Sequence, residues 1–489
     1  MKGKQDSGHI DSFYHCARVG EGEELCQGTA CFVARHLNPG RWSAAVSREQ
    51  RVYCLGNCFM SPASSSDVGR PRMRILSREP IILGPIIDGP ISSVAAFTAK
   101  GGYRVLEKAL TRPRAELVGA VELSKLRGRG GAGFSTGKKW RAVAEQKGSE
   151  KFVVANADEG DPGAYIDRFL LEDDPHRLIE AMAIAGYAVG AAKGYVYLRK
   201  EYPHARMVFE KALMEARRAG FLGQQILHSD LSFDVELVIG QGSYVCGEET
   251  ALLNSIEGHR PEVRLRPPYP SESGLFGKPT LINNVETLAN IPWIIRNGGE
   301  AFRRLGFSNS RGTKVLSFNS LFRAPGLYEI DFGVTIRQVV EDLGGGLKSG
   351  NIKGVIIGGP LAGIIPPRLF DTPLGFEELA AIGASVGHGG VVAFDEHTSI
   401  ADLIHHVFGF AAYESCGKCT PCRLGSRRVE RQFQQILETG HVPAHERTES
   451  MEIVSALAMT SLCGLGTGLA EFAQSALRHY AEELEPCFS

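Results

Sequence analysis

Four cysteines near the C-terminus constrain this chain more than any other feature. Three recur at two-residue gaps in Glu414-Ser415-Cys416-Gly417-Lys418-Cys419-Thr420-Pro421-Cys422, and a fourth stands alone in Ser461-Leu462-Cys463-Gly464. A tight turn can aim three thiolates at one face of a 4Fe-4S cluster while a distant segment supplies the fourth. The alternative is a structural zinc site, which usually has two separated Cys-x-x-Cys pairs. The spacing therefore favours one 4Fe-4S cluster on Cys416, Cys419, Cys422 and Cys463, and an electron-transfer protein.

A second group of cysteines lies near the N-terminus, where Cys26 and Cys31 are followed by Cys54 and Cys58. Two segments that each supply two thiolates suit a 2Fe-2S cluster, with two thiolates on each iron. We expect such a cluster in a small domain over residues 1–75. The alternative is a domain that has kept its fold and lost its cluster, because the connection between Cys31 and Cys54 is short.

Length and composition limit the possible classes of protein. A chain of 489 residues is long enough for about three domains, each with its own core. A net charge of -1 argues against a nucleic-acid surface. The polar N-terminus and the glycine and proline residues that interrupt residues 81–97 predict neither a signal peptide nor a membrane span. Eleven cysteines are better explained by metal ligation than by disulfides, which predicts a reducing, cytoplasmic location.

The central part of the chain alternates strands and helices. Strands are predicted over residues 151–155, 194–199 and 233–239, and helices over residues 178–192, 204–219 and 248–256. This alternation predicts a parallel sheet with helices on both faces. Because ligands bind beyond the carboxyl ends of such strands, we expect the loops at residues 156–161, 200–202 and 240–244 to meet at one crevice.

The remaining segments complete an α/β fold of several domains. Residues 76–112 read as a connector, and residues 113–311 as a Rossmann-like domain. Glycine-punctuated strands over residues 312–395 suggest a small β-grasp-like (ubiquitin-like) domain. Helical periodicity returns over residues 396–489, and a four-helix bundle would bury its amphipathic helices around the 4Fe-4S site.

The densest glycine run of the chain contains Gly128, Gly130 and Gly133 and is followed by Lys139. The Gly-x-Gly-x-x-Gly pattern alone is weak, because the segment before it reads as a helix and not as the strand of a dinucleotide fingerprint. Glycines nevertheless let backbone amides approach a phosphate or lie under an aromatic ring. A flexible hinge is the alternative interpretation, but the neighbouring Phe134 offers a stacking surface.

Five segments together give a specific resemblance. Besides the glycine loop and the Cys416–Cys422 run, they are Asn156-Ala157-Asp158-Glu159, Tyr244-Val245-Cys246-Gly247-Glu248-Glu249-Thr250 and Asn283-Asn284-Val285-Glu286-Thr287. In this order, the chain resembles the 51-kDa-type flavoprotein subunit shared by respiratory complex I, NAD-reducing hydrogenase and soluble NAD-dependent formate dehydrogenase. The N-terminal cysteine region is similar to the family's 24-kDa-type thioredoxin-like subunit, here fused to it.

The resemblance implies FMN on the glycine loop and NADH stacked on the flavin. The residues implied for FMN are Gly128, Gly130, Lys139, Asn156, Asp158, Tyr244, Gly247, Glu248, Asn283, Asn284 and Thr287. Those implied for the nicotinamide dinucleotide are Phe134, Lys139, Asp161, Glu249 and Tyr269. Two positions depart from the family's pattern: Asp161 is shorter than the glutamate common in complex I, and Ala142 replaces an aromatic residue that often stacks there.

Several of these residues also have a purely structural interpretation. Glu248 and Glu249 open a predicted helix, where acids are favoured by the helix dipole. Tyr269 lies in a proline-rich turn and could simply pack. Two acids in a ligand crevice nevertheless favour a functional role. The negative charges of Glu249 and Asp161 predict a preference for NAD over NADP.

The other half-reaction requires a partner, because no sequence segment suggests a site for formate, hydrogen or quinone chemistry. Residues 201–205, 386–392, 415–419 and 461–463 resemble the formate dehydrogenase branch of the family more than complex I. We therefore expect the NADH-handling β subunit of a molybdenum- or tungsten-dependent formate dehydrogenase, which passes electrons between NAD, FMN and iron-sulfur clusters. Its partners would be the catalytic subunit and other iron-sulfur subunits. The alternatives are the flavoprotein subunit of a hydrogenase or of complex I, and a non-catalytic electron-relay subunit.

Overall fold

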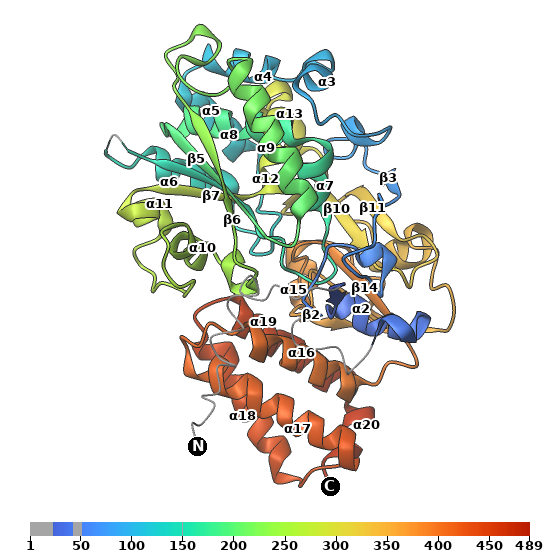
Figure 1. The fold of residues 1–489 in the computed structure, drawn as a ribbon. Coiled ribbons are helices and arrows are strands. Elements are labelled where there is room, and N and C mark those ends of the chain that lie inside the picture. The colour runs from blue at the N-terminus through green and yellow to red at the C-terminus, as the bar shows by residue number, and fades with distance from the viewer. Residues whose placement is uncertain (1–22, 43–50, 149) are drawn as a thin grey trace.

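The computed structural model describes residues 23–42, 51–148 and 150–489. Figure 1 shows a parallel-sheet domain at the top, a second sheet domain at the right, a helical bundle at the bottom, and a short N-terminal segment in blue between the last two.

The parallel sheet has four strands in the order β6-β5-β4-β7. These strands are β4 (Phe152–Ala157), β5 (Lys193–Leu198), β6 (Asp234–Ile239) and β7 (Thr280–Asn284). All three pairings are parallel. The predicted sheet is confirmed, and the predicted helices are α8 (Pro175–Val189), α9 (Pro203–Arg218) and α10 (Glu249–Ile256). Strand β7 was not predicted, and it extends the sheet on the far side of β4.

The sheet separates two hydrophobic cores because successive side chains of a strand point to opposite faces. Along β4, Val153 and Ala155 belong to the large core that includes α8, whereas Phe152 and Val154 belong to a smaller core that includes Leu252 of α10. Burial on both faces explains the continuous apolar run of β4, which is typical of parallel sheets. In the edge strand β6, Asp234 and Glu236 are exposed.

Shorter helices surround this sheet. They are α3 (Val94–Ala99), α4 (Arg104–Leu110), α5 (Arg114–Ser124), α6 (Thr136–Ala144), α7 (Ile166–Asp173), α11 (Pro270–Ser273), α12 (Val285–Ala289), α13 (Ile291–Asn297) and α14 (Gly299–Arg303). Helix α12 is joined to the second sheet by an ion pair between Glu286 and Lys314, both fully buried. Removing one member of a buried ion pair leaves the other charge buried without a partner, which is unfavourable. This ion pair therefore fixes how the two domains meet.

The second sheet has six strands in the order β13-β12-β14-β10-β11-β3. Its strands are β3 (Met73–Ile75), β10 (Thr313–Phe318), β11 (Gly326–Asp331), β12 (Ile352–Ile357), β13 (Ile364–Ile365) and β14 (Gly390–Asp395), with α15 (Phe376–Ala381) before β14. The edge strand β3 comes from far upstream and pairs in parallel with β11. The connector that follows β3 is held by Glu329, whose carboxylate accepts backbone N–H groups of Ile81, Ile82 and Leu83.

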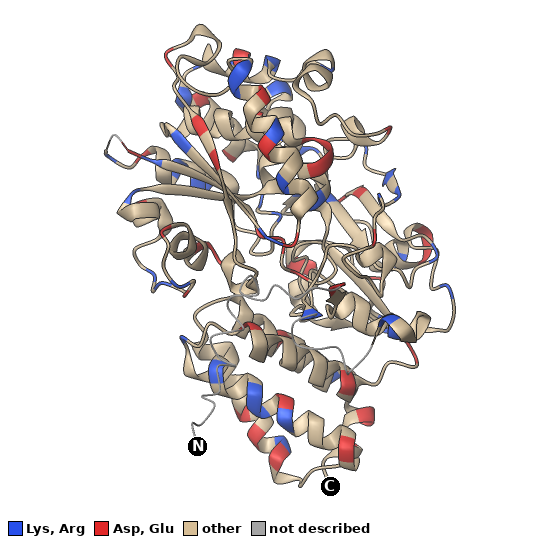
Figure 2. Cartoon of the chain, in the orientation of Figure 1, with Lys and Arg blue, Asp and Glu red and all other residues tan. Residues whose placement is uncertain are grey.

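The C-terminal bundle has four long helices, as predicted. They are α16 (Ile400–Glu414), α17 (Ser426–Thr439), α18 (His445–Thr460) and α19 (Gly464–His479), followed by the short α20 (Ala481–Leu484). Figure 2 shows basic and acidic residues mixed along these helices, and Arg428 of α17 pairs with Glu446 and Glu449 of α18. Among the described residues, no helix combines the length and the apolar character needed to cross a membrane.

The N-terminal segment packs against the bundle. Its described elements are the parallel strands β1 (Leu25–Cys26) and β2 (Arg51–Val52) and the helix α2 (Thr29–Val33). Phe32 stacks on His406 of α16 with ring centroids 4.1 Å apart, and Arg35 pairs with Asp402 at 2.6 Å. Residues 1–22 and 43–50 of the predicted 1–75 domain lie outside the described residues, so its thioredoxin-like fold stays a prediction.

Candidate functional site

Two adjoining cavities of about 560 and 400 Å³ form one crevice at the carboxyl ends of the parallel strands. Both are lined by Asn156 at the end of β4 and Asn284 at the end of β7, and also by Gly130, Glu248 and Cys463. The crevice lies at the carboxyl ends of the strands, as predicted, but residues 200–202 line neither cavity, and of the 240–244 loop only Tyr244 does. Because Cys463 belongs to the bundle, one of the proposed 4Fe-4S ligands borders the crevice directly.

The crevice brings together every residue that the sequence predicted for flavin or nicotinamide. The larger cavity is lined by Gly128, Gly130, Gly133, Phe134, Lys139, Asn156, Gly247, Glu248, Glu249, Tyr269, Asn283, Asn284 and Thr287. The smaller cavity adds Asp158, Asp161 and Tyr244. Their individual ligand roles stay predictions.

The glycine loop packs so closely against β7 that side chains are excluded. A Cβ atom at Gly130 would lie 2.7 Å from Cβ of Asn284, and Gly133 has a φ of +59°. Within the loop, the N–H of Arg129 donates to Thr287 Oγ1 at 2.8 Å. The Arg129 side chain points inward and donates to backbone carbonyls, and burial lowers the pKa of its guanidinium to about 10. These contacts fix the backbone of the glycine loop, so the loop is rigid and does not act as a flexible hinge.

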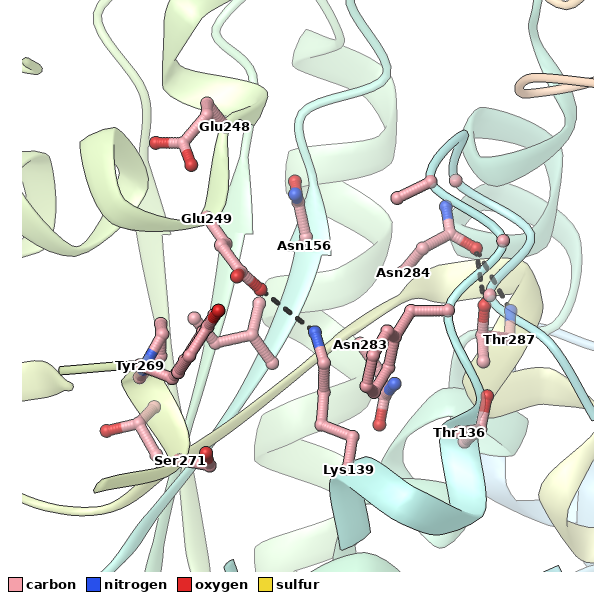
Figure 3. Close-up of a pocket in the computed structure, with 18 of the residues that line it drawn as sticks. Thr136, Lys139, Asn156, Glu248, Glu249, Tyr269, Ser271, Asn283, Asn284 and Thr287 are labelled. Carbon is pink, nitrogen blue, oxygen red and sulfur yellow. Dashed lines mark hydrogen bonds and ion pairs between the residues drawn. The ribbon is translucent and has the colours of Figure 1, made fainter. Parts of the chain in front are cut away.

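Lys139, Glu249 and Arg266 form a charged group at one wall of the crevice. Lys139 Nζ lies 2.9 Å from Glu249 Oε2 (Figure 3), and Arg266 lies 3.2 Å from Glu249 Oε1. Burial alone would raise the pKa of Glu249, but the two cations more than offset it and lower that pKa. Glu249 is thus a carboxylate that neutralises two cations beside the cavity.

Glu248 has the structural role that its position at a helix start suggested. Its Oε2 accepts the backbone N–H groups of Thr250 and Ala251, both at 2.9 Å. A side chain that caps α10 in this way is held in one orientation. Nearby, Asn156 donates from Nδ2 to the carbonyl of Gly247 at 2.8 Å and so ties two crevice loops together.

Two buried polar atoms in the crevice have no partner among the described residues. They are Oδ2 of Asp158 and Oγ1 of Thr136. Burial raises the pKa of the Asp158 carboxyl well above its usual range. Buried polar groups normally find a hydrogen-bond partner, and a flavin offers both ring N–H donors and carbonyl acceptors. These orphaned atoms therefore fit an FMN group in this crevice.

Two exposed aromatic side chains stand at the mouth of the larger cavity. Phe134 is 55% exposed and Tyr269 is 54% exposed. Rings left open to solvent beside a cavity offer surfaces on which a nucleotide base can stack. Ala142, which departs from the family's pattern, also lines this cavity. The smaller side chain offers no stacking surface, so Phe134 and Tyr269 are the aromatic residues of this cavity on which a base could stack.

The four C-terminal cysteines converge between the bundle and the crevice. Cys463 packs against the small buried cluster that contains Cys416, and Cys419 and Cys463 also pack against the core that contains Cys422. Three thiols from one turn and a fourth from a distant segment are the arrangement expected for a 4Fe-4S cluster.

The N-terminal cysteines lie together. Sγ of Cys54 is 3.7 Å from Sγ of Cys58, and Cys26 interacts with both Cys31 and Cys54. All four thiols are buried. Four neighbouring thiols are the number that a 2Fe-2S cluster requires, so these residues fit such a cluster, which stays a prediction.

Among the crevice residues that were not predicted, Arg266 and His388 carry charge or can do so. Arg266 precedes the proline-rich turn of Tyr269, and its charge was the available signal. His388 reaches the smaller cavity from the second sheet domain, within the glycine-rich stretch of residues 386–392. The sequence marks that stretch only by its resemblance, because nothing in it indicates which segment it contacts.

Comparisons with known proteins agree with this geometry. Residues 121–293 match the Nuo51 FMN-binding domain, and residues 402–487 match the NADH-ubiquinone oxidoreductase-F iron-sulfur binding region. The chain is 42% identical over 418 residues to the NADP-reducing hydrogenase subunit HndC of Solidesulfovibrio fructosivorans, covering 85% of this chain and 84% of that protein. It is 42% identical over 409 residues to an NADH-quinone oxidoreductase subunit of Rhizobium meliloti, covering 83% of this chain and 96% of that protein.

A solved structure has the same fold. The crystal structure of an NAD+-reducing [NiFe]-hydrogenase in the H2-reduced state superposes with a TM-score of 0.80 at 28% identity, covering 99% of this chain and 87% of that one. Fold, crevice and cysteines thus define a nicotinamide-dependent flavoprotein that also binds a 4Fe-4S cluster. The chain belongs to the 51-kDa-type family of NADH dehydrogenase flavoproteins.

Proposed function

We propose that this chain is the NADH-handling β subunit of a soluble molybdenum- or tungsten-dependent formate dehydrogenase, working in the cytoplasm. The observation that carries its electron-transfer role is Cys463, a proposed cluster ligand that also lines both cavities of the crevice. The proposed cluster site would therefore lie directly beside a flavin bound in the crevice. The choice of formate dehydrogenase is supported by residues 201–205 and 386–392, which resemble that branch of the family.

In this proposal, the chain's own residues bind and orient two groups. FMN, when bound, exchanges a hydride with NADH and single electrons with an iron-sulfur cluster. The glycine loop with Asn283, Asn284 and Thr287 would hold FMN, and Phe134, Lys139 and Tyr269 would hold the dinucleotide. No residue of the crevice has to abstract a proton, so binding and orientation are the chain's contribution.

The first experiment separates this role from that of the partner. The purified chain, reconstituted with FMN and iron under anaerobic conditions, should reduce artificial electron acceptors with NADH and should not oxidise formate. Adding the catalytic partner should restore formate-dependent NAD+ reduction. Formate oxidation by the chain alone would contradict the proposal, and loss of NADH-dependent dye reduction would favour a non-catalytic relay.

Iron content tests the N-terminal cluster. If Cys26, Cys31, Cys54 and Cys58 hold a 2Fe-2S cluster beside the 4Fe-4S cluster, the chain should contain about six irons. Cys54→Ser should then lower the iron content and remove one electron paramagnetic resonance signal. A wild-type content of about four irons, unchanged in the variant, would mean that this segment has kept its fold without a cluster.

A second assignment is supported by the relatives, whose names are those of hydrogenase and quinone oxidoreductase subunits. The same diaphorase module would then pass electrons to or from a hydrogenase or a quinone-reducing complex. Co-purification decides between the assignments, because the largest subunit that accompanies the chain carries the chemistry of the other half-reaction.

A further inference from the structure

His388 lies in the loop that leads into β14 and points from the second sheet domain into the wall of the crevice. The side chain is buried and lines the smaller cavity. Its Nε2 lies 2.9 Å from Asp167 Oδ2 on α7, and its Nδ1 lies 3.7 Å from Asp161 Oδ2. One imidazole ring thus bridges an acid inside the flavin domain and an acid on the crevice surface.

The carboxylates around this ring already accept hydrogen bonds from other groups. Asp167 accepts the N–H of Glu286 at 3.0 Å and the amide of Asn284. Glu159, whose Oε1 lies 3.6 Å from His388 Nε2, accepts the N–H groups of Asp167 and Arg168. A metal ion would have to displace these hydrogen bonds. The group of Glu159, Asp167 and His388 is therefore a hydrogen-bonded network and not an ion site.

The network favours a doubly protonated ring because both ring nitrogens face carboxylates. Burial alone would lower the pKa of His388, but Asp167, Asp161 and Glu159 more than offset it and raise that pKa well above its usual value. A buried cation held between acids on two sides is fixed in position as long as both partners remain.

The ring holds two predicted ligand residues in place. Asp161 is gripped from two sides, because its Oδ1 accepts the Tyr244 hydroxyl at 2.7 Å while its Oδ2 faces His388. Asn284 donates to the same Asp167 oxygen as His388, and its Oδ1 accepts the N–H of Thr287 at 3.0 Å. Asn284 Nδ2 also lies 3.3 Å from His388 Nε2. Removing His388 would therefore loosen Asp161 directly, and Asn284 both directly and through Asp167.

Close backbone packing fixes the loop that carries His388. A Cβ atom at Gly387 would lie 2.1 Å from the carbonyl oxygen of Gly358, and one at Gly390 would lie 2.7 Å from the backbone of Gly163. Gly387 and Gly389 also have positive φ values of +50° and +89°. The loop is therefore pressed against the residues that follow Asp161 and can act as a rigid support.

We propose that His388 is a positioning residue, which reaches across the domain boundary to fix Asp161 and Asn284 and so sets both the affinity for the nicotinamide dinucleotide and the retention of FMN. This inference rests on the proposed ligand roles of those two residues. In this proposal, His388 affects the affinity for the nicotinamide dinucleotide through Asp161. It affects the retention of FMN through Asp167 and Asn284.

The test compares two buried histidines in the full chain reconstituted with FMN. In His388→Gln the amide can reach one acid but not both, so a charge-assisted contact is lost. We expect the KM for NADH and the dissociation constant of FMN, measured by flavin fluorescence, each to rise about tenfold. The kcat for dye reduction should change much less, because the reacting groups stay in place once bound.

His176→Gln is the matched control. His176 is fully buried and bonded to the Tyr103 hydroxyl at 2.8 Å, and it lines neither cavity of the crevice. This variant should lower the thermal midpoint without changing the KM for NADH or the affinity for FMN. A rise in both constants in the control as well would mean that His388 acts only through general stability, and would overturn the proposal.

Asp161→Asn keeps the proposal testable should His388→Gln fail to fold. It should raise the KM for NADH to the same extent. Where His388→Gln folds, the double variant should show no further rise, because both changes break one contact. Additive effects in the double variant, or an unchanged KM in Asp161→Asn, would overturn the proposal. A wild-type chain without FMN binding or NADH-dependent dye reduction would instead refute the proposed function itself.

Discussion

Cys419→Ser should leave the reduction of FMN by NADH intact while electron transfer out of the flavin slows by at least about a hundredfold. The magnitude follows because even changes to groups that only support a metal ligand cost about 10- to 100-fold, and Cys419 is a proposed ligand itself. The flavin half should survive because Cys419 lines neither cavity of the crevice, whereas Cys463 lines both.

Two measurements separate the halves of this reaction. Anaerobic stopped-flow absorbance follows flavin reduction by NADH, and turnover of the assembled complex follows electron exit through the cluster. Cys487→Ser, which changes another partly exposed cysteine at the end of the bundle, should leave both rates unchanged. An equal loss of flavin binding and of flavin reduction in Cys419→Ser would show that the two sites are not separable.

The parallel sheet was predictable because each of three strands can be recognised from the apolar pattern of its own residues. β4 and β5 have apolar residues on both faces, β6 has an apolar face formed by Val235, Leu237 and Ile239, and each strand is followed by a helix with its own apolar face. β7 was missed because it ends in Asn283 and Asn284, two polar residues that resemble a loop when seen alone. Trp140 donates to Oδ1 of Asn283 at 3.0 Å, which is a contact that no local pattern reveals.

The contribution of β3 was hidden for a different reason. Met73–Ile75 is only three residues long, and its pairing partner β11 lies far along the chain. An edge strand of this kind forms because the second sheet supplies an open edge, and not because of its own propensity. The last residues of the predicted 1–75 domain therefore belong to the second sheet.

The candidate site divides in the same way. The crevice residues predicted by resemblance all line the two cavities, because each lies in a motif with its own residue pattern. Arg266 and His388 were missed because each is defined by partners on other segments: Glu249 on α10 for Arg266, and Asp161 and Asp167 for His388. Long-range electrostatic partners are what sequence patterns describe least well.

The structure changes the expected basis of nucleotide preference. From the sequence, Glu249 was expected to reject NADP by charge repulsion alone. In the structure it also neutralises Lys139 and Arg266, the two cations paired with it in the crevice. Its removal would therefore lift the repulsion and release two cations for a 2′-phosphate.

Glu249→Gln should keep NADH activity within about an order of magnitude and raise the ratio of NADPH to NADH activity by tens-fold. Like charges near 4 Å repel by roughly 4 kcal/mol at an effective dielectric of 20. Glu249 is only 24% exposed at its side chain, so much of that repulsion survives screening. Since each 1.4 kcal/mol is about tenfold, even half of it gives the predicted ratio. Glu257→Gln, which removes an acid paired with Arg264 at the other end of α10, is the matched control. Steady-state kinetics with both nucleotides decide the matter, because an unchanged ratio in Glu249→Gln would assign discrimination to another part of the crevice.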